Sequence, residues 1–382
     1  MRYPVRSGAD CLAETDELTE GLRVGLMTNP TGVDHELRST VDLLRARCRL
    51  TALFAVEHGI RGEIQAGETV DSFTDPETGI PVYSAYGKNS RFSPEMLDAF
   101  DVLVFDIQDV GARFYTYLYS LSYAMEACAR GGKRLIVLDR INPLGGLKRT
   151  GLILEKGLSS FVGDHELLTQ YGMTIGEYAL YVKDHLKLDL SLTVIPLRGW
   201  ERRMYLDDTD LPWVAPSPNC PDLDAALCYT GTCIFEGTNC SEGRGTTLPF
   251  RVIGAPWLDD GELEKRMREI DTPGIRFRRT SFRPTFSKHA GELCRGVQMH
   301  ITDREKCDVF AAGLYLLDTI RQLSGDRFEF IRWPNDARYP FDKLFGTSDY
   351  RTGKCTPARL TARAAAERDA FEKKIAPYLL YR

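Results

Sequence analysis

The sequence contains no long apolar run. Its longest apolar stretches, such as LIVL at 135–138, are far shorter than the roughly 20 residues that a membrane-spanning helix needs. The amino-terminal segment MRYPVRSGADCLAETDEL has a basic start but lacks the apolar core of a secretory signal. We therefore expect a soluble, cytoplasmic protein without a membrane span, and an exported one only if a leader has been removed.

An excess of positive charge is absent as well. The 49 Lys and Arg residues stand against 54 Asp and Glu residues, which gives a net charge of −5. A protein that binds duplex nucleic acid must neutralise many phosphates, so no nucleic-acid partner is predicted. The hydrophobic fraction of 43% and the charged fraction of 27% are ordinary for a globular protein, and 382 residues exceed the usual size of one hydrophobic core. Two domains are therefore expected.

The common motifs for cofactors and metals are missing. The turn after the first predicted strand reads MTNPTGV, without the GxGxxG of dinucleotide enzymes, and the sequence contains neither GxxxxGK[ST] nor HExxH. The histidines show no paired ligand spacing. Cys220, Cys228, Cys233 and Cys240 cluster without the CxxC spacing of a structural zinc site, and the ten cysteines are interpreted as mostly reduced thiols. No cofactor and no metal are expected.

Short apolar runs and helix-like stretches alternate through the first half of the chain. Strands are predicted at 23–29, 50–56, 101–107, 134–140 and 192–200. Helices are predicted at 39–48, 93–100 and 117–132. This alternation is typical of a parallel sheet covered by helices, so the fold class is α/β with a Rossmann-like domain.

A Pro-rich passage at 211–222 and a Gly-rich polar loop at 236–249 interrupt this pattern. Beyond them the sequence predicts a charged helix, two strands, an apolar helix and a carboxy-terminal helix at about 357–375. These elements indicate a second, smaller α+β domain. We place the Rossmann-like catalytic domain at 1–225 and the smaller domain, which completes a cleft, at 226–382.

Polar residues follow four successive predicted strands. They are Asn29 and Thr31 after the first strand, Glu57, His58 and Arg61 after the second, Asp106, Gln108, Asp109 and Arg113 at the third, and Arg140 and Asn142 at the fourth. Ligands of an open parallel sheet bind outside the carboxyl ends of its strands. We therefore expect these residues to line one crevice, although Asp and Asn at strand ends also serve as turn formers and helix caps.

Three of these residues are distinguished by their local sequence. Glu57 follows an apolar strand directly, and glutamate is neither a preferred cap nor a turn former, which favours a functional role. Asp106 lies inside the apolar run VLVFDI and needs a partner, so a structural hydrogen bond and catalysis both stay open. Asp109 lies beyond the strand end and is better placed to contact a ligand.

The loop at 236–247 combines glycines with charged and polar residues, including Glu236, Asn239, Glu242 and Arg244. Glycines let the backbone and a neighbouring arginine approach a ligand closely. The alternative is a solvated linker between domains. We predict a functional loop.

Several long segments resemble a known family. They are FAVEHGIRG (54–62), VFDIQDVGARFYTY (104–117), LDRINPLGG (138–146), SPNCP (217–221), EGTNCSEGRGTTLPF (236–250) and FSKHAGELCRGVQMHITD (286–303). In this order they resemble the NamZ exo-β-N-acetylmuramidases. The resemblance implies a Rossmann-like domain and a smaller domain with the site between them. It also implies release of N-acetylmuramic acid from the non-reducing end of a peptidoglycan-derived disaccharide or muropeptide.

Glycoside cleavage needs a carboxylic acid that protonates the leaving oxygen, and usually a second carboxylate. Within this hypothesis Glu57 is the general acid and Asp109 its partner, with Glu236 or Glu242 as further candidates beside Asp106. The 2-acetamido group of the substrate can also serve as internal nucleophile, and the sequence leaves this open. The lactyl carboxylate of muramic acid needs a cation, for which Arg61, Arg113, Arg140 and Arg244 are candidates, with Arg244 preferred.

Two other functions fit the same cleft. One is a sugar-binding protein without turnover, and the other is an amidase or esterase that acts on wall peptides. The amidase needs an activated Ser or Cys beside a His, and the sequence contains no GxSxG elbow.

Overall fold

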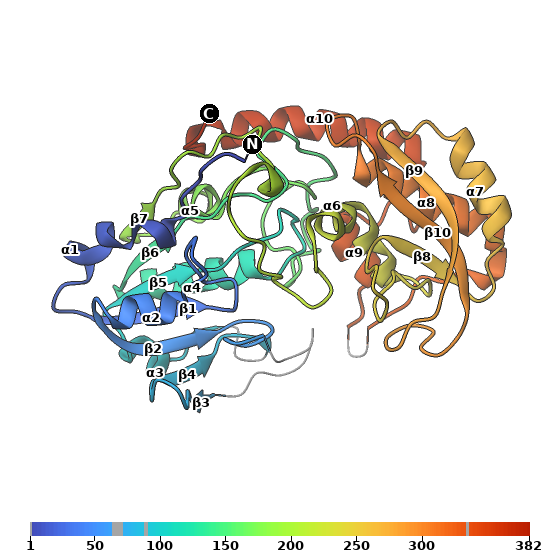
Figure 1. Ribbon diagram of the computed structural model, residues 1–382. Coiled ribbons are helices and arrows are strands. Elements are labelled where there is room, and N and C mark those ends of the chain that lie inside the picture. Colours follow the sequence, from blue (N-terminus) through green and yellow to red (C-terminus); the bar gives the residue numbers. More distant parts are fainter. Residues whose placement is uncertain (1, 63–71, 88–90, 334–335) are drawn as a thin grey trace.

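The computed structural model describes residues 2–62, 72–87, 91–333 and 336–382 (Figure 1). Its larger sheet contains six parallel strands and one antiparallel edge strand within the described residues. The parallel strands are β1 (Arg23–Thr28), β2 (Arg49–Ala55), β4 (Pro81–Ser84), β5 (Val102–Asp106), β6 (Arg134–Leu138) and β7 (Leu192–Ile195), and the edge strand is β3 (Phe73–Thr74). The parallel strands lie side by side in the order β4-β2-β1-β5-β6-β7, which is the order of a Rossmann fold.

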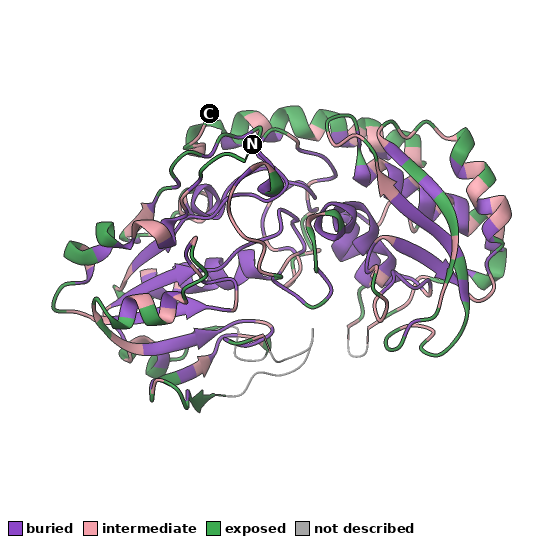
Figure 2. Cartoon of the chain, viewed as in Figure 1, coloured by how far each residue is buried: buried purple, intermediate pink, exposed green. Residues whose placement is uncertain are grey.

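Alternation along the strands supplies both faces of this sheet with apolar side chains. In β5, Leu103 and Phe105 pack on one face, while Val102 and Val104 pack on the other. The first face is covered by α3 (Pro94–Asp98), α4 (Tyr117–Gly131) and α5 (Ile175–His185). The second is covered by the 3-10 helix η1 (Gly8–Thr15) and by α2 (Thr40–Arg45). Figure 2 shows the central strands buried over most of their length, as expected for a sheet covered on both sides.

Helix boundaries follow the capping residues of the sequence. The side chain of Ser39 accepts a hydrogen bond from the N–H of Val41 at the start of α2, and Ser93 accepts one from Met96 at the start of α3. Gly132 ends α4 with a left-handed φ of 61°. The predicted strands and helices of the first half are therefore confirmed, with ends that are shorter by up to five residues, as at 192–200 against Leu192–Ile195.

The second unit is built on a three-stranded antiparallel sheet. Its strands are β8 (Val252–Ala255), β9 (Ile275–Phe282) and β10 (Cys294–Ile301), in the order β8-β10-β9. Its main helices are α6 (Leu223–Thr232), α7 (Asp260–Glu269), α8 (Val309–Ser324) and α9 (Pro340–Phe345). The smaller predicted α+β unit is thus confirmed.

Short helices complete the description. They are α1 (Asp16–Thr19) and the 3-10 helices η3 (Leu206–Asp208), η4 (Cys233–Gly237), η5 (Gly325–Arg327) and η6 (Ala376–Tyr378). None of the helices within the described ranges combines the length and apolar composition of a membrane span. All ten cysteines are free thiols.

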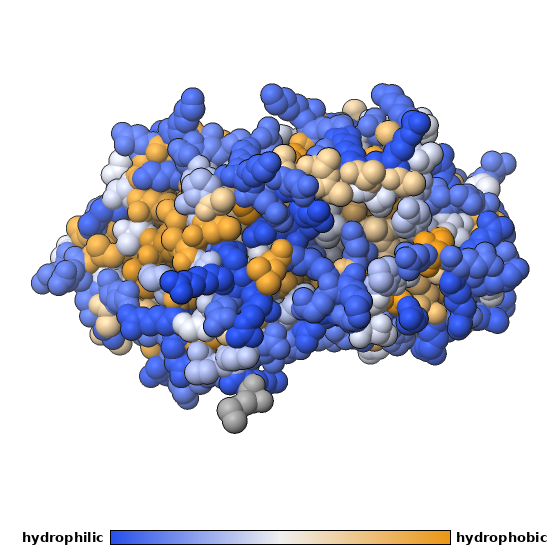
Figure 3. All heavy atoms as spheres, turned by 90° about the horizontal axis from the view of Figure 1, so that it is seen from above, coloured by the Kyte–Doolittle hydropathy of each residue, from blue (hydrophilic) through white to orange (hydrophobic). Residues whose placement is uncertain are grey.

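The carboxy-terminal helix α10 (Pro357–Ile375) lies across both units (Figure 1). Leu360 near its start belongs to the core of the second unit, whereas Phe371 and Ile375 near its end belong to the core of the first. Ion pairs add to this contact, since Lys374 pairs with Glu166 at 2.6 Å. Seen from the side of α10, the surface is largely hydrophilic, and its hydrophobic residues gather over the first unit (Figure 3). The helix therefore ties the two units together.

Candidate active site

A cleft of about 970 Å³ lies between the two units. Residues of the first unit form one wall: Glu57, Tyr86, Thr116, Phe161 and Val162. Residues of the second form the other: Glu236, Glu242, Arg244, Phe286, Ser287, Lys288, Ile331 and Trp333, with Asn219 from the connecting segment. Three carboxyl groups and two cations thus share one cleft that also has aromatic walls, a composition suited to a sugar.

Glu57 reaches the cleft because strand β2 ends at Ala55, two residues before it. The backbone of the next residue, His58, is left-handed with a φ of 75°, so the chain bends sharply there. Tyr86 donates a hydrogen bond of 2.8 Å to Oε1 of Glu57, and Thr116 donates one of 2.7 Å to Oε2. A hydroxyl can donate or accept, so these two groups hold the carboxyl plane in either protonation state.

The opposite wall carries a network of alternating charges. Arg244 donates a hydrogen bond of 2.6 Å from Nη2 to Glu236, and its Nε lies 3.4 Å from Glu242. Lys288 Nζ lies 2.7 Å from the other oxygen of Glu242. Burial would lower the pKa of Arg244, but the carboxylates of Glu236 and Glu242 raise it above its ordinary value, so the guanidinium stays charged.

Glycines allow this wall to form. Gly245 has a left-handed φ of 78°, and a Cβ there would lie 2.6 Å from the carbonyl oxygen of Phe286. At Gly237 a Cβ would lie 2.4 Å from the backbone nitrogen of Phe341. The predicted functional loop is therefore packed against the β9–β10 connection and against α9, and both contacts exclude a side chain.

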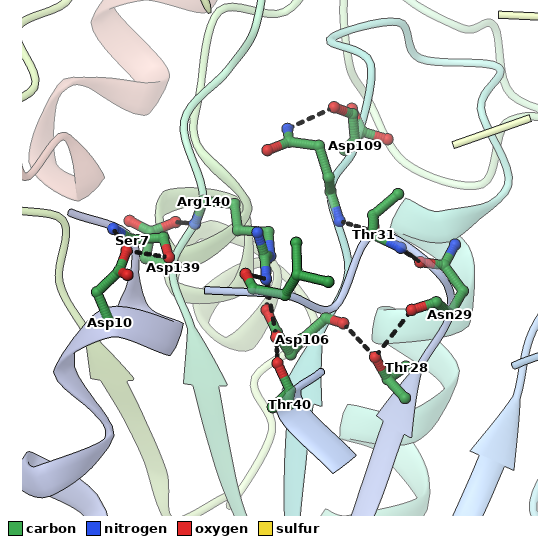
Figure 4. A network of polar contacts seen from close by, with 12 residues as sticks. Ser7, Asp10, Thr28, Asn29, Thr31, Thr40, Asp106, Asp109, Asp139 and Arg140 are labelled. Atoms are coloured by element: carbon green, nitrogen blue, oxygen red, sulfur yellow. Dashed lines mark hydrogen bonds and ion pairs between the residues drawn. The ribbon is translucent and has the colours of Figure 1, made fainter. Parts of the chain in front are cut away.

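Most of the predicted strand-end residues do not line the cleft. Asp106 is completely buried and accepts hydrogen bonds from Arg140 Nε at 2.5 Å and from Thr40 at 2.5 Å (Figure 4). Arg140 also donates to the carbonyl of Val33 at 2.8 Å. The prediction that Asp106 serves catalysis and Arg140 a ligand carboxylate is not supported, because each neutralises the other inside the protein.

The other polar residues of this edge bind one another. Asn29 accepts hydrogen bonds from the N–H and the hydroxyl of Thr31, and the Thr31 hydroxyl accepts one from the N–H of Gln108 at 2.8 Å (Figure 4). The side chain of Gln108 donates to the carbonyls of Asp109 and Ile141. The expectation of one crevice lined by four strand ends is therefore wrong. Thr31, Gln108 and Arg140 line a separate pocket of about 20 Å³, and of the predicted strand-end residues that the structure describes only Glu57 lines the cleft.

Asp109 is also buried, with 4% of its surface exposed. It accepts hydrogen bonds from the hydroxyl of Tyr171 and from the N–H of Gly111. Burial raises the pKa of Asp109 to about 6, although both hydrogen bonds oppose this shift. Asp109 is not among the residues that line the cleft, so it does not fit the predicted role of partner to Glu57.

Replacing Asp109 with asparagine is expected to change how stability depends on pH. The pKa of the folded state, about 6, lies above the ordinary value of 3.8, so this carboxyl contributes stability below pH 4 that is lost as the pH rises to about 6. The parent should therefore lose about 2 to 3 kcal/mol relative to Asp109→Asn over this interval. Urea unfolding of both proteins between about pH 4 and pH 7 measures the difference, and parallel curves would contradict it.

The remaining predicted ligands have partners elsewhere. Arg113 is fully buried and donates to the carbonyls of Lys343 and Leu344 at the end of α9, and burial lowers its pKa. Arg61 pairs with Asp75 and Glu77, each at 2.9 Å. Neither arginine lines the cleft, which corrects their prediction as partners of a lactyl carboxylate.

Three further predicted ligands lie outside the cleft lining. Asn142 donates a hydrogen bond of 3.0 Å to the carbonyl of Met173. Asn239 donates one of 2.8 Å to the carbonyl of Arg327. His58 is buried, with 4% of its surface exposed. The two asparagines act as supports of the local backbone.

Six residues of the cleft that carry polar groups were not among the predicted site residues: Tyr86, Thr116, Asn219, Ser287, Lys288 and Trp333. Asn219 and Lys288 lie inside the segments SPNCP and FSKHAGELC, which the resemblance already singled out. Lys288 donates to the carbonyls of Phe235 and Thr238 as well as pairing with Glu242, so it joins the connection after β9 to the Gly-rich loop. The sequence signal that could have identified Asn219 and Lys288 was their position as polar residues inside segments that carry the family resemblance.

Comparison with known proteins gives concordant results. The family model described as Exo-beta-N-acetylmuramidase NamZ, N-terminal, matches residues 24–224, and the model for the C-terminal part matches residues 227–381. The chain is 48% identical over 351 residues to the peptidoglycan beta-N-acetylmuramidase NamZ of Bacillus subtilis, covering 91% of this chain and 84% of that protein.

Two crystal structures of DUF1343 family proteins from Bacteroides fragilis are similar to the chain over nearly its whole length. One has a TM-score of 0.92 at 36% identity and covers 100% of both chains. The other has a TM-score of 0.78 at 31% identity and covers 99% of both chains. The similarity therefore includes the arrangement of the two units.

Proposed function

Because this chain belongs to the NamZ exo-β-N-acetylmuramidase family, we propose that its cleft hydrolyses the β-glycosidic bond of a non-reducing-end N-acetylmuramic acid. The substrate is a peptidoglycan-derived disaccharide or muropeptide. The observation that carries this proposal is the position of Glu57 and Glu236 on opposite walls of one cleft. Hydrolysis of a chromogenic β-N-acetylmuramide, compared with the matching glucosaminide, tests it.

Glu57 is the general acid in this mechanism. It projects from the end of β2, and the hydroxyls of Tyr86 and Thr116 fix its carboxyl group. In this position it donates a proton to the leaving glycosidic oxygen as the bond to the anomeric carbon breaks. Tyr86 and Thr116 are positioning residues.

Glu236 replaces Asp109 as the proposed second carboxylate. Its side chain is 20% exposed in the cleft, whereas that of Glu242 is 2% exposed and held by Lys288. Glu236 is therefore the more accessible carboxylate on the wall opposite Glu57. Its charge stabilises the positive anomeric centre of the transition state, either as base toward water or as an orienting group for the 2-acetamido nucleophile.

We assign Arg244 to neutralising the charge of the Glu236 carboxylate and to orienting it. Arg244→Met is expected to lower kcat/KM by about ten- to a hundredfold on the muramide and the glucosaminide alike, because both substrates need the oriented carboxylate. Arg268→Met removes an exposed arginine that pairs with Glu264 on α7, and it should leave both rates unchanged. A fall confined to the muramide would return Arg244 to the role of partner for the lactyl carboxylate.

The other proposed activities fit the cleft less well. No histidine is among the described residues that line it, so the Ser–His or Cys–His pair expected of the amidase or esterase does not form there. A protein that only binds sugars would show affinity for the muramide without turnover. We keep the proposed halves of the cleft, residues 1–225 and 226–382, with the start of α6 (Leu223–Thr232) at their junction. We also keep the cytoplasm as the proposed compartment, since all ten cysteines are thiols.

A further inference from the structure

A small side pocket opens from the cleft. Its volume is about 20 Å³, enough for one group the size of a water molecule or a methyl group. Asn219 and Arg244 line both the pocket and the cleft, so the two spaces are joined there. The remaining lining residues are Tyr115, Ser217, Cys220, Tyr229 and Phe250.

The walls of this pocket are fixed by packed aromatic rings. The ring of Tyr229 meets that of Phe250 edge to face at 4.6 Å and that of Tyr115 at 6.0 Å. Cys220 closes another side and is 3% exposed. Because protein interiors are close-packed, the pocket cannot expand by the size of even one methylene group without disturbing these contacts.

Asn219 presents an unsatisfied amide at the entrance. The residue is only 5% exposed. Its backbone N–H donates to Ser217 at 3.3 Å, but its side-chain amide has no hydrogen-bond partner among the described residues. The hydroxyl of Tyr115, on the pocket wall, is likewise buried without a partner in the described part of the chain. Buried polar groups are normally hydrogen-bonded, so the Tyr115 hydroxyl, together with the Asn219 amide that lines the cleft, leaves hydrogen-bonding capacity for a ligand with both polar and apolar parts.

We infer that this side pocket and Asn219 bind the 2-acetamido group of the sugar in the cleft. The acetyl methyl group fills the aromatic pocket, while Oδ1 of Asn219 accepts a hydrogen bond from the amide N–H. This assignment rests on the proposed function, which supplies a 2-acetamido sugar. A lactyl group is too large for a space of about 20 Å³. Its carboxylate also needs a cation, and Arg244 beside the pocket is already paired with Glu236 and Glu242.

The first test compares ligands that differ only at the 2-position. The dissociation constants of N-acetylmuramic acid and of its 2-hydroxy analogue are measured by calorimetry on the parent and on Asn219→Ala. The parent should prefer the acetamido sugar by about ten- to a hundredfold, and the variant should lose this preference by weaker binding of that sugar alone. Equal weakening of both ligands, or an unchanged preference, would overturn the assignment.

A second test probes the size of the pocket and does not depend on Asn219. The parent should hydrolyse an N-acetyl muramide at least about tenfold faster than its N-butyryl analogue, since overpacking a fixed site is costly. Cys220→Ala widens the pocket and should reduce this ratio. Equal rates for both substrates in the parent would contradict a methyl-sized pocket.

Failure of the proposed hydrolase function and failure of the pocket assignment give different results. A folded parent that hydrolyses no β-N-acetylmuramide, yet still prefers the acetamido ligand, would contradict the hydrolase and leave the pocket assignment intact. A parent that hydrolyses muramides at equal rates whatever their 2-substituent would support the hydrolase and contradict the pocket assignment.

Discussion

Glu57→Gln is expected to lower kcat by about a hundred- to ten-thousandfold on a disaccharide substrate, the range typical of a lost general acid. Glutamine keeps the volume of glutamate and can still bond to Tyr86 and Thr116, so the fold should persist. Only the transferable proton is removed. A substrate with an acidic leaving group such as 4-nitrophenol needs less protonation, so its rate should fall less than that of the disaccharide.

Steady-state kinetics on both substrates measure this difference. Glu20→Gln is the matched control, because Glu20 is exposed between α1 and β1, and it should leave both rates unchanged. Near-normal turnover of the disaccharide by Glu57→Gln would end the assignment. An equal loss on both substrates would indicate a nucleophile or an orienting group instead of an acid.

Arg140→Leu is expected to destabilise the folded state by about 3 to 5 kcal/mol, the usual cost of leaving a buried charge without its partner. Asp106 has no exposed surface, and the side chain of Arg140 is 8% exposed. The guanidinium makes two hydrogen bonds to the carboxylate, at 2.5 and 2.8 Å. With leucine in its place, Asp106 keeps only weaker neutral donors such as Thr40.

Denaturant unfolding of the variant gives the loss directly. The double variant Asp106→Asn with Arg140→Leu should recover much of the stability, since the orphaned charge is then gone. Arg198→Leu removes an exposed partner of Glu14 and should cost less than about 1 kcal/mol. A loss of that small size for Arg140→Leu would mean that Asp106 is not held as an ion in this network.

The sequence predicts the fold class because its signals are local. The run VLVFDI alternates between two buried faces, so Leu103 and Val104 necessarily pack on opposite sides of a covered sheet. Ser93 and Gly132 mark helix ends through bonds to residues within four positions. Glu57 was recognisable for a similar reason, since a glutamate directly after a buried strand is unusual wherever the strand lies.

Which strand-end side chains reach a ligand is decided by contacts across the chain. Asp106 and Arg140 are 34 positions apart, and only the neighbouring strands β5 and β6 bring them into one ion pair. Arg113 points to α9, 230 positions away. From the sequence alone, each of these residues is a candidate ligand, because the sequence does not show these distant partners.

The two walls of the cleft were likewise beyond local reasoning. Glu236 faces Glu57 because the second unit folds back over the first and α10 ties them together. Asn219 is recognised as a candidate binding residue only from its position, where it lines both the cleft and a pocket of about 20 Å³. The sequence by itself determined the elements and the carboxyl chemistry, because these depend on neighbouring residues. Only the tertiary structure decided which polar groups are neutralised inside and which remain for a substrate, because their partners lie far along the chain.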